Sequence, residues 1–236
     1  MNLWDRRIAR AHLLESQYPA AAELLGFYRE IAAFQKQIWQ AALPALPLSL
    51  HPGIPEPLRP YIQPLLALLQ RVAPPELAAA AGPWPPAPGP HAFLTRVLLQ
   101  PYAESLARRP IRAPDSSTAA CPVCNELPVA AILRPEGEGG KRSLLCSLCF
   151  TEWDFRRLLC PSCGEEDHQK LPVYTAEPFP HVRIEACDTC RTYLKSIDLT
   201  RDGLAVPEVD EIAALPLDLW ASSHDYSKLQ SNLFGL

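Results

Sequence analysis

Four Cys-x-x-Cys pairs constrain this chain more than any other feature of its sequence. They contain all eight of its cysteines, which are Cys121, Cys124, Cys146, Cys149, Cys160, Cys163, Cys187 and Cys190. A Cys-x-x-Cys turn directs two thiolates to one side and lets its backbone N–H groups donate to the sulfurs, so two facing turns form a tetrahedral four-sulfur cage. The spacing therefore predicts two metal sites, and the alternative is eight buried thiols that only pack.

The gaps between the pairs indicate which pairs share an ion. They are 21, 10 and 23 residues long, which is typical of a tandem duplication. Leu127–Val129 has a counterpart in Leu171–Val173, and a threonine stands two residues after the last cysteine of each half, at Thr151 and Thr192. We expect the first pair to join the second and the third to join the fourth. An interleaved arrangement fits the repeat less well.

Four thiolates in tetrahedral geometry suit zinc or a rubredoxin-type iron, and the ligand set does not separate the two metals. Zinc is the more frequent metal in such sites. A thioredoxin-like redox role for one pair is the weaker hypothesis, because that motif opens a helix in a βαβ context that the sequence does not show.

The N-terminal residues carry early charges at Asp5, Arg6 and Arg10 and have no apolar stretch typical of a signal peptide. The uncharged stretch 37–55 contains four prolines, which would break a membrane-spanning helix. The sequence therefore predicts a cytoplasmic protein without stable membrane insertion. In that reducing compartment, metal explains paired cysteines better than disulfides do.

The first half of the chain has the apolar spacing of helices. The apolar pattern of residues 4–43 predicts two amphipathic helices, of which Pro19 opens the second. Further helices are expected at about 56–72, 75–81 and 90–108, each starting near a proline. From Cys121 onward, short β-branched stretches alternate with Gly, Pro and acidic clusters, as in small strands and turns. Such small elements bury little surface, so a metal would stabilise each unit.

We therefore predict an α+β fold, in which a helical N-terminal domain precedes two tandem rubredoxin-like or zinc-ribbon-like β domains. The expected boundaries are 1–112 for the helical domain, 113–120 for a linker, 121–157 and 158–200 for the two tetra-cysteine domains, and 201–236 for a C-terminal extension.

Charge and motifs narrow the function. Residues 121–200 carry 9 basic and 12 acidic side chains, which disfavours a nucleic-acid partner. No Ser/His/Asp grouping, phosphate loop or dinucleotide fingerprint emerges, so we predict that the chain is not an enzyme. His168 and His181 lie within the second cysteine unit, where four thiolates already fill a site, and both are expected to be ordinary surface histidines.

Two segments of the cysteine-bearing part are specific, CxLCxTEWxxxRxxCxxC at 146–163 and EACDTCRTYLKSID at 185–198. They resemble the FdhE family of formate dehydrogenase accessory proteins, and the likeness extends to 7–36 and 226–235. The resemblance implies a helical domain followed by two rubredoxin-like domains, iron in the tetra-cysteine sites, and a cytoplasmic chaperone that binds the catalytic subunit of formate dehydrogenase. Arg191 departs from the pattern, because glycine often follows the last cysteine in the family.

Three functional hypotheses follow. The leading one is an accessory protein or chaperone for formate dehydrogenase maturation, with homo-oligomer formation left open. The alternatives are a rubredoxin-type electron-transfer protein and a zinc-ribbon nucleic-acid-binding protein. Around the cages, Glu152, Trp153, Arg157 and Tyr193 are expected either to contact the partner or to fix one domain against the other.

Overall fold

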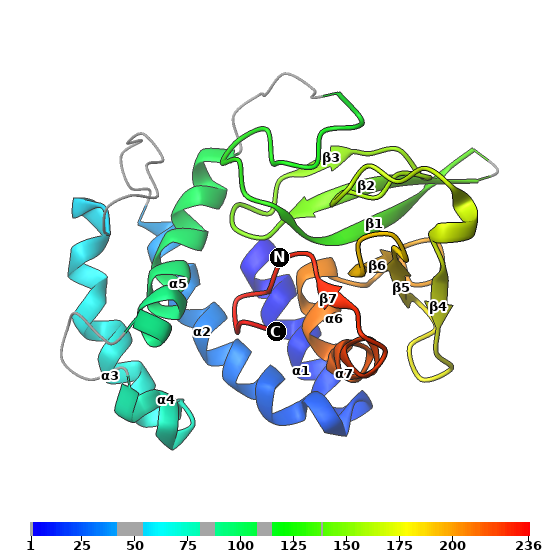
Figure 1. Ribbon diagram of the computed structural model, residues 1–236. Helices are drawn as coiled ribbons and strands as arrows, with labels where there is room; N and C mark the ends of the chain where they lie inside the picture. The colour runs from blue at the N-terminus through cyan, green and yellow to red at the C-terminus, as the bar shows by residue number, and fades with distance from the viewer. Residues whose placement is uncertain (1, 42–53, 81–87, 108–114, 138) are drawn as a thin grey trace.

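The computed structural model describes residues 2–41, 54–80, 88–107, 115–137 and 139–236 (Figure 1). Its helices are α1 (Leu3–Gln17), α2 (Ala22–Gln40), α3 (Ile62–Val72), α4 (Pro75–Ala80), α5 (Pro88–Ala107), α6 (Pro207–Ala213) and α7 (Leu215–Ser223). Its strands are β1 (Pro128–Glu136), β2 (Gly139–Cys146), β3 (Glu152–Asp154), β4 (Val173–Thr175), β5 (Val182–Ala186), β6 (Thr192–Asp198) and β7 (Ser227–Lys228). Positions 113 and 114 of the predicted linker lie outside the described residues.

Local sequence signals set the starts of the N-terminal helices. The side chain of Asn2 caps α1 by accepting from the backbone N–H of Asp5 at 2.8 Å. Pro19 opens a 3₁₀ turn that leads into α2, and Pro75 begins α4. The predicted helical N-terminal region is therefore confirmed. Among the described helices, none has the length and apolar character needed to cross a bilayer.

The strands form one sheet in the order β3-β2-β1-β6-β5-β4, with β7 added beside β6. Within each cysteine unit the three strands pair antiparallel, and the two units are joined by parallel pairing of β1 with β6, from Ala130 opposite Lys195 to Leu133 opposite Asp198. The α+β class is thus confirmed, and the two units share one sheet. Their boundaries as domains stay a prediction.

The two faces of the sheet are buried by different partners. One face carries Ile132, Ile184 and Ile197 and packs on the C-terminal helices, whose Leu217 belongs to the same apolar cluster. The opposite face carries Leu144 in a cluster that continues into the N-terminal helices and includes three cysteines of the first unit. Strands alternate their side chains between faces, so both faces of the central strands are apolar.

Helix α6 lies between α1 and the sheet and is held there by buried ion pairs (Figure 1). Arg7 of α1 binds Glu104 of α5 at 2.7 Å and Glu208 of α6 at 2.5 Å. Arg10 binds Asp210 of α6 at 2.5 Å. The C-terminal segment is therefore an integral part of the core that joins the helical region to the sheet.

A second buried charge cluster joins the sheet to α6 and α7. Lys195 of β6 is fully buried, and its ammonium group lies 2.9 Å from Glu211 and 2.5 Å from Asp218. Lys228 also binds Glu211, and Asn232 donates to the same carboxylate at 3.0 Å. Every charge in this cluster has an opposite partner, which is the condition for burying it without a large penalty.

The cluster predicts a loss of stability in acid. Burial by itself would raise the pKa of Glu211, but the ammonium groups of Lys195 and Lys228 outweigh it and lower that pKa from 4.5 to about 2. A carboxyl whose pKa is lower in the folded state stabilises the fold above pH 4.5, and this contribution is lost as the pH falls from 4.5 towards 2. Urea unfolding is expected to show that the free energy of unfolding falls across this pH window, and that it falls less in Glu211→Gln. An equal fall in both proteins would contradict this role of Glu211.

Candidate metal centres

All four Cys-x-x-Cys segments adopt the same closed turn. In each, the backbone N–H of the first cysteine donates at 2.9 Å to the carbonyl five residues later. The carbonyls belong to Glu126, Thr151, Glu165 and Thr192. Amide hydrogen bonds to sulfur accompany this closure, from Val123 to Cys121 and from Ser162 to Cys160, both at 3.4 Å. The four segments thus have the backbone geometry that is typical of metal-binding knuckles.

The residue after each second cysteine has a positive φ. The angles are 63° at Asn125, 51° at Phe150, 77° at Gly164 and 59° at Arg191. This left-handed residue turns the chain out of the knuckle. It is strained for a side chain with a Cβ, and Asn and Gly tolerate it best. In the last knuckle this position is occupied by Arg191, where the family that the sequence resembles often has glycine.

Replacing Gly164 by alanine is expected to destabilise the protein by about 1 kcal/mol, because an L-residue pays for the left-handed backbone there. A Cβ at this position would meet none of the described atoms within 4 Å, so steric clash with them adds no cost. Gly203→Ala is the matched control, since Gly203 lacks a positive φ and its nearest neighbour would be 3.8 Å away. Urea unfolding of the metal-loaded variants measures the difference, and equal stabilities would contradict the prediction.

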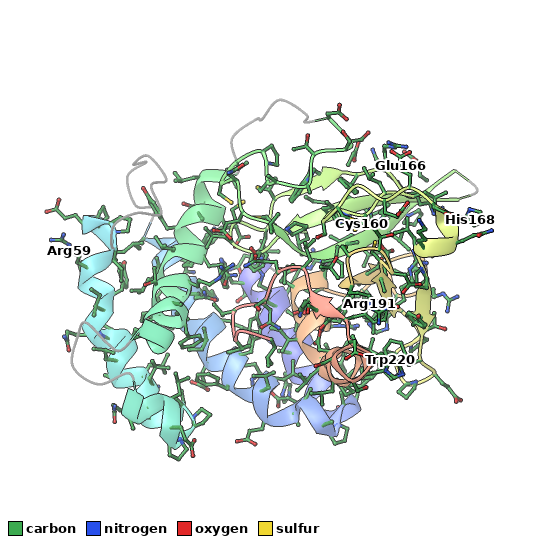
Figure 2. The ribbon with its side chains drawn as sticks, viewed as in Figure 1. Arg59, Cys160, Glu166, His168, Arg191 and Trp220 are labelled. Carbon is green, nitrogen blue, oxygen red and sulfur yellow. The ribbon has the colours of Figure 1, made fainter. Side chains whose placement is uncertain are left out.

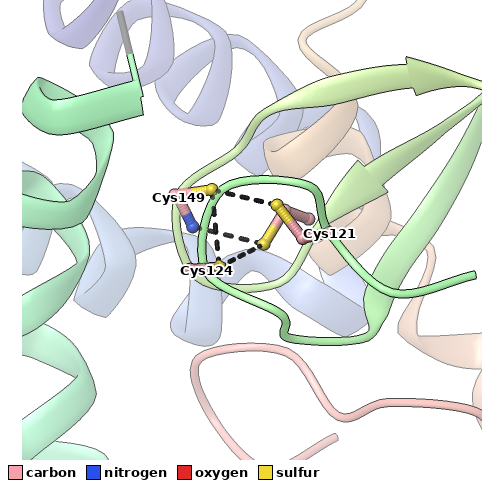
Figure 3. Close-up of side chains that lie close together, drawn as sticks. Cys121, Cys124 and Cys149 are labelled. Carbon is pink, nitrogen blue, oxygen red and sulfur yellow. Dashed lines mark hydrogen bonds between the residues drawn. The ribbon is translucent and has the colours of Figure 1, made fainter. Parts of the chain in front are cut away.

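The first two knuckles face each other (Figure 3). The sulfur of Cys124 lies 3.3 Å from that of Cys146 and 3.6 Å from that of Cys149, and the sulfurs of Cys121 and Cys149 are 3.5 Å apart. A tetrahedron with metal–sulfur bonds of about 2.3 Å has edges of about 3.8 Å. The hydroxyl of Thr151 lies 3.0 Å from the Cys149 sulfur. The four sulfurs therefore have the size of a cage for one ion.

The last two knuckles form a second group of the same size. Cys160 and Cys190 sulfurs are 3.7 Å apart, as are those of Cys163 and Cys187. Thr192 repeats the contact of Thr151, with its hydroxyl 2.9 Å from the Cys190 sulfur. Burial raises the pKa of the Cys190 thiol, but hydrogen bonds from Thr192 outweigh it and lower the pKa to about 6. The thiolate, the form that binds metal, is thus favoured at Cys190, whereas burial raises the pKa of the Cys163 thiol.

The grouping follows the repeat, first pair with second and third with fourth, and all eight cysteines are free of disulfides. Within each group the sulfurs lie within 4.8 Å of one another. Both groups could hold a metal ion, and the donor set fits zinc and iron equally. That these eight thiolates ligate metal stays a prediction. The repeated threonines were visible in the sequence, but their contact with sulfur could be found only in the fold.

Two family models match the cysteine-bearing part of the chain. The FdhE central domain covers residues 120–157, and the FdhE C-terminal domain covers residues 158–234. The chain belongs to the FdhE family.

Individual FdhE proteins support this assignment. An FdhE homolog of Aquifex aeolicus is 39% identical over 116 residues, 49% of this chain and 41% of that protein. An FdhE homolog of Haemophilus influenzae is 35% identical over 48% of this chain and 37% of that protein. One from Edwardsiella ictaluri is 30% identical over 83% of this chain and 65% of that protein. The matches to the first two thus span about two fifths of those relatives' length.

The fold is also that of a solved FdhE structure. The crystal structure of FdhE from Pseudomonas aeruginosa superimposes with a TM-score of 0.79, covering 98% of this chain and 95% of the other at 23% sequence identity. The likeness extends to the helical region, which neither family model covers. The arrangement of helices around the sheet is therefore the FdhE fold.

The two cages of this FdhE chain differ in burial. In the first, Cys121, Cys146 and Cys149 are buried in the apolar cluster that includes α2 and α5. Helix α2 reaches the knuckle through Gln35, which donates to Gln100 at 3.0 Å, and Gln100 in turn donates to the Ser147 carbonyl at 3.4 Å. In the second cage, Cys163 is exposed and Cys190 is half-buried. The first cage is thus part of the core, and the second lies at the surface.

The four residues expected near a partner or between the domains have different settings. Trp153 is buried and donates to the Thr118 carbonyl at 2.9 Å. Tyr193 is buried and donates to Asp218 at 2.7 Å. Glu152 is half-buried and binds Arg134 at 2.7 Å. Arg157 is exposed and donates to the Gly140 carbonyl at 3.2 Å. Their roles stay a prediction.

His181 corrects one expectation. His168 is exposed as predicted and projects from the edge of the molecule (Figure 2). His181 is buried, with its Nε2 2.7 Å from Asp210. Together with Asp202 these groups are close enough to surround an ion, but the guanidinium of Arg10 already binds both carboxylates. The cluster is therefore an ion-pair network that fixes α6.

Proposed function

We propose that this chain is a cytoplasmic accessory protein that holds the catalytic subunit of formate dehydrogenase while its cofactors are inserted or activated. Membership of the FdhE family supports this proposal. So does the chemistry of the cages: four thiolates around one ion leave no open coordination position, which suits structure or electron transfer and disfavours hydrolysis. In this proposal the chain binds and positions its partner, and performs no reaction on a substrate.

The observation that carries the proposal is that the two cages and the helices are packed together in one structure. The first cage lies in the helical core, and the parallel pairing of β1 with β6 ties the second cage to the first. A metal in each cage would stabilise the sheet. Helices, knuckles and sheet are thus joined in one packed structure, which suits the recognition of a protein partner.

Co-purification tests the proposal. Affinity-tagged chain expressed with the catalytic subunit is expected to capture it, and a strain that lacks the chain is expected to lose formate dehydrogenase activity. A plasmid copy should restore that activity. Full activity in the deletion strain, or no capture from cells that contain both proteins, would contradict the proposal.

One observation favours electron transfer as a second candidate function. The exposure of Cys163 brings the second cage to the surface, where a short electron path to a partner would be available. This candidate requires iron. Anaerobically purified protein should then be coloured and show a one-electron redox wave, whereas a colourless zinc-loaded sample would exclude it.

A further inference from the structure

One face of the sheet is left open beside the second cage. The face that carries Leu144 and Leu194 is covered over β1 and β2 by the apolar cluster shared with the N-terminal helices, whereas in the part of the chain that the structure describes it is open to a cavity over β4 and β5. A cavity of about 220 Å³ lies there. It is lined by Arg142, Arg157, Arg183, Glu185, Leu158 and Val173, and it is bordered by Cys160 and Cys187 of the cage.

The mouth of this cavity is apolar and exposed. Leu158 is 55% exposed and Val173 is 51% exposed, and both rank among the few large aliphatic side chains that the described residues leave in water. Val173 of β4 pairs with Glu185 of β5, and Glu185 pairs with Leu194 of β6. These three residues therefore form one row across neighbouring strands, on the face that lines the cavity. Exposed aliphatic side chains that rim a cavity are typical of a binding surface.

Apart from the cysteines of the cage, the charged side chains that line the cavity are mostly positive. Three arginines face a single carboxylate, Glu185, which accepts from Arg142 at 2.8 Å and from Arg183 at 3.0 Å. The Nε–H of Arg183 is buried without an acceptor in the described structure, and the Arg157 guanidinium donates to the Gly140 carbonyl. The Arg183 side chain as a whole is still partly exposed, as is Arg157, and a carboxylate supplied by a ligand would form charge-assisted hydrogen bonds with their guanidinium groups.

We propose that this cavity binds an extended segment of a partner protein that carries an aliphatic side chain and a carboxylate two residues apart. In an extended peptide, residues i and i+2 project to the same side, so both side chains would enter the cavity. The aliphatic side chain packs on Leu158 and Val173. The carboxylate binds Arg157 and Arg183.

The cage fixes the orientation of the segment. Thiolates of Cys160 and Cys187 border one end of the cavity, and their negative charge repels a carboxylate there. Arg157 and Arg183 also line an adjoining hollow with Gly140 and Thr200, which does not include the cage. The carboxylate therefore lies at the end away from the metal. The identity of the partner rests on the proposed function, but the chemistry of the segment does not.

A labelled pentapeptide tests the inference. The probe is fluorescein-Ser-Leu-Thr-Glu-Ser-amide, and its binding to the full metal-loaded chain is measured by fluorescence anisotropy. Control peptides carry glutamine for the glutamate or serine for the leucine. Arg183→Gln and Val173→Ser are each expected to weaken binding about tenfold, since each removes a hydrogen-bonded charge or an apolar contact. Control variants are Arg201→Gln and Leu204→Ser, whose exposed side chains lie outside the cavity.

The outcomes separate this inference from the proposed function. Equal binding of the probe and both control peptides, or undiminished binding by Val173→Ser with unchanged circular dichroism, would overturn the cavity as the peptide site. Concentration-dependent self-association that disappears in Val173→Ser would show that a second copy occupies it, and would also overturn the inference. If Val173→Ser and Arg183→Gln capture the catalytic subunit as wild type does, the inference fails and the proposed function stands. If wild type captures no subunit but binds the peptide, only the proposed function fails.

Discussion

Replacing Cys146 by serine is expected to unfold the sheet, whereas the same replacement at Cys163 is expected to leave a folded protein that retains one metal. Cys146 is fully buried in the cluster shared with the helices, and Cys163 is exposed at the second cage. Losing the ion of the core cage is expected to cost about 4 kcal/mol or more, because metal binding and folding are coupled there. Loss at the surface cage is expected to cost about 1–2 kcal/mol.

Thermal melting by circular dichroism, together with metal content, measures both effects. Serine is only slightly smaller than cysteine, so altered packing accounts for a minor part of the lost stability. Alanine at each position serves as the matched control. Equal melting temperatures for the two serine variants would contradict the account. So would loss of both metals in Cys163→Ser while the helices remain folded.

Lys195→Met is expected to destabilise the protein by about 3–5 kcal/mol, the cost of leaving buried carboxylates without their partner. Lys195 is fully buried between Glu211 and Asp218, and Lys228 alone would have to balance both charges. Methionine preserves most of the side-chain volume, so the loss reports the charge. Urea unfolding at pH 7 measures it.

A double variant separates charge from packing. Adding Glu211→Gln to Lys195→Met is expected to restore part of the stability, since one of the unpaired carboxylates is then neutral. Lys141→Met is the control, because Lys141 forms an exposed ion pair with Asp154 and is expected to change stability by less than about 1 kcal/mol. A double variant as unstable as the sum of the two single variants would contradict the cluster as described.

Local chemistry made part of the fold predictable. Pro19 and Pro75 begin helices because proline is accepted in a first helical turn, and the resulting segments stand where the sequence placed them. The grouping of the cysteines followed from a repeat, whose two long gaps each hold the first two strands of one unit. These features depend on residues close together in the chain.

The remainder depends on residues that are far apart. The sequence carries no local sign that β1 pairs with β6, because central strands with two apolar faces can join on either side. His181 and Lys195 are buried only because Asp210 and Glu211 of α6 lie opposite them. Polar residues are usually exposed, so their burial follows from the partner and not from the residue itself. The cavity beside Arg183 arises from the same long-range assembly.

X-ray absorption at the metal edge, combined with metal content of anaerobically purified protein, tests the central claim most directly. The account predicts two ions per chain, each surrounded by four sulfurs at about 2.3 Å, with no nitrogen or oxygen neighbour. One ion or none per chain, light-atom ligands in either site, or disulfides among the eight cysteines would contradict it.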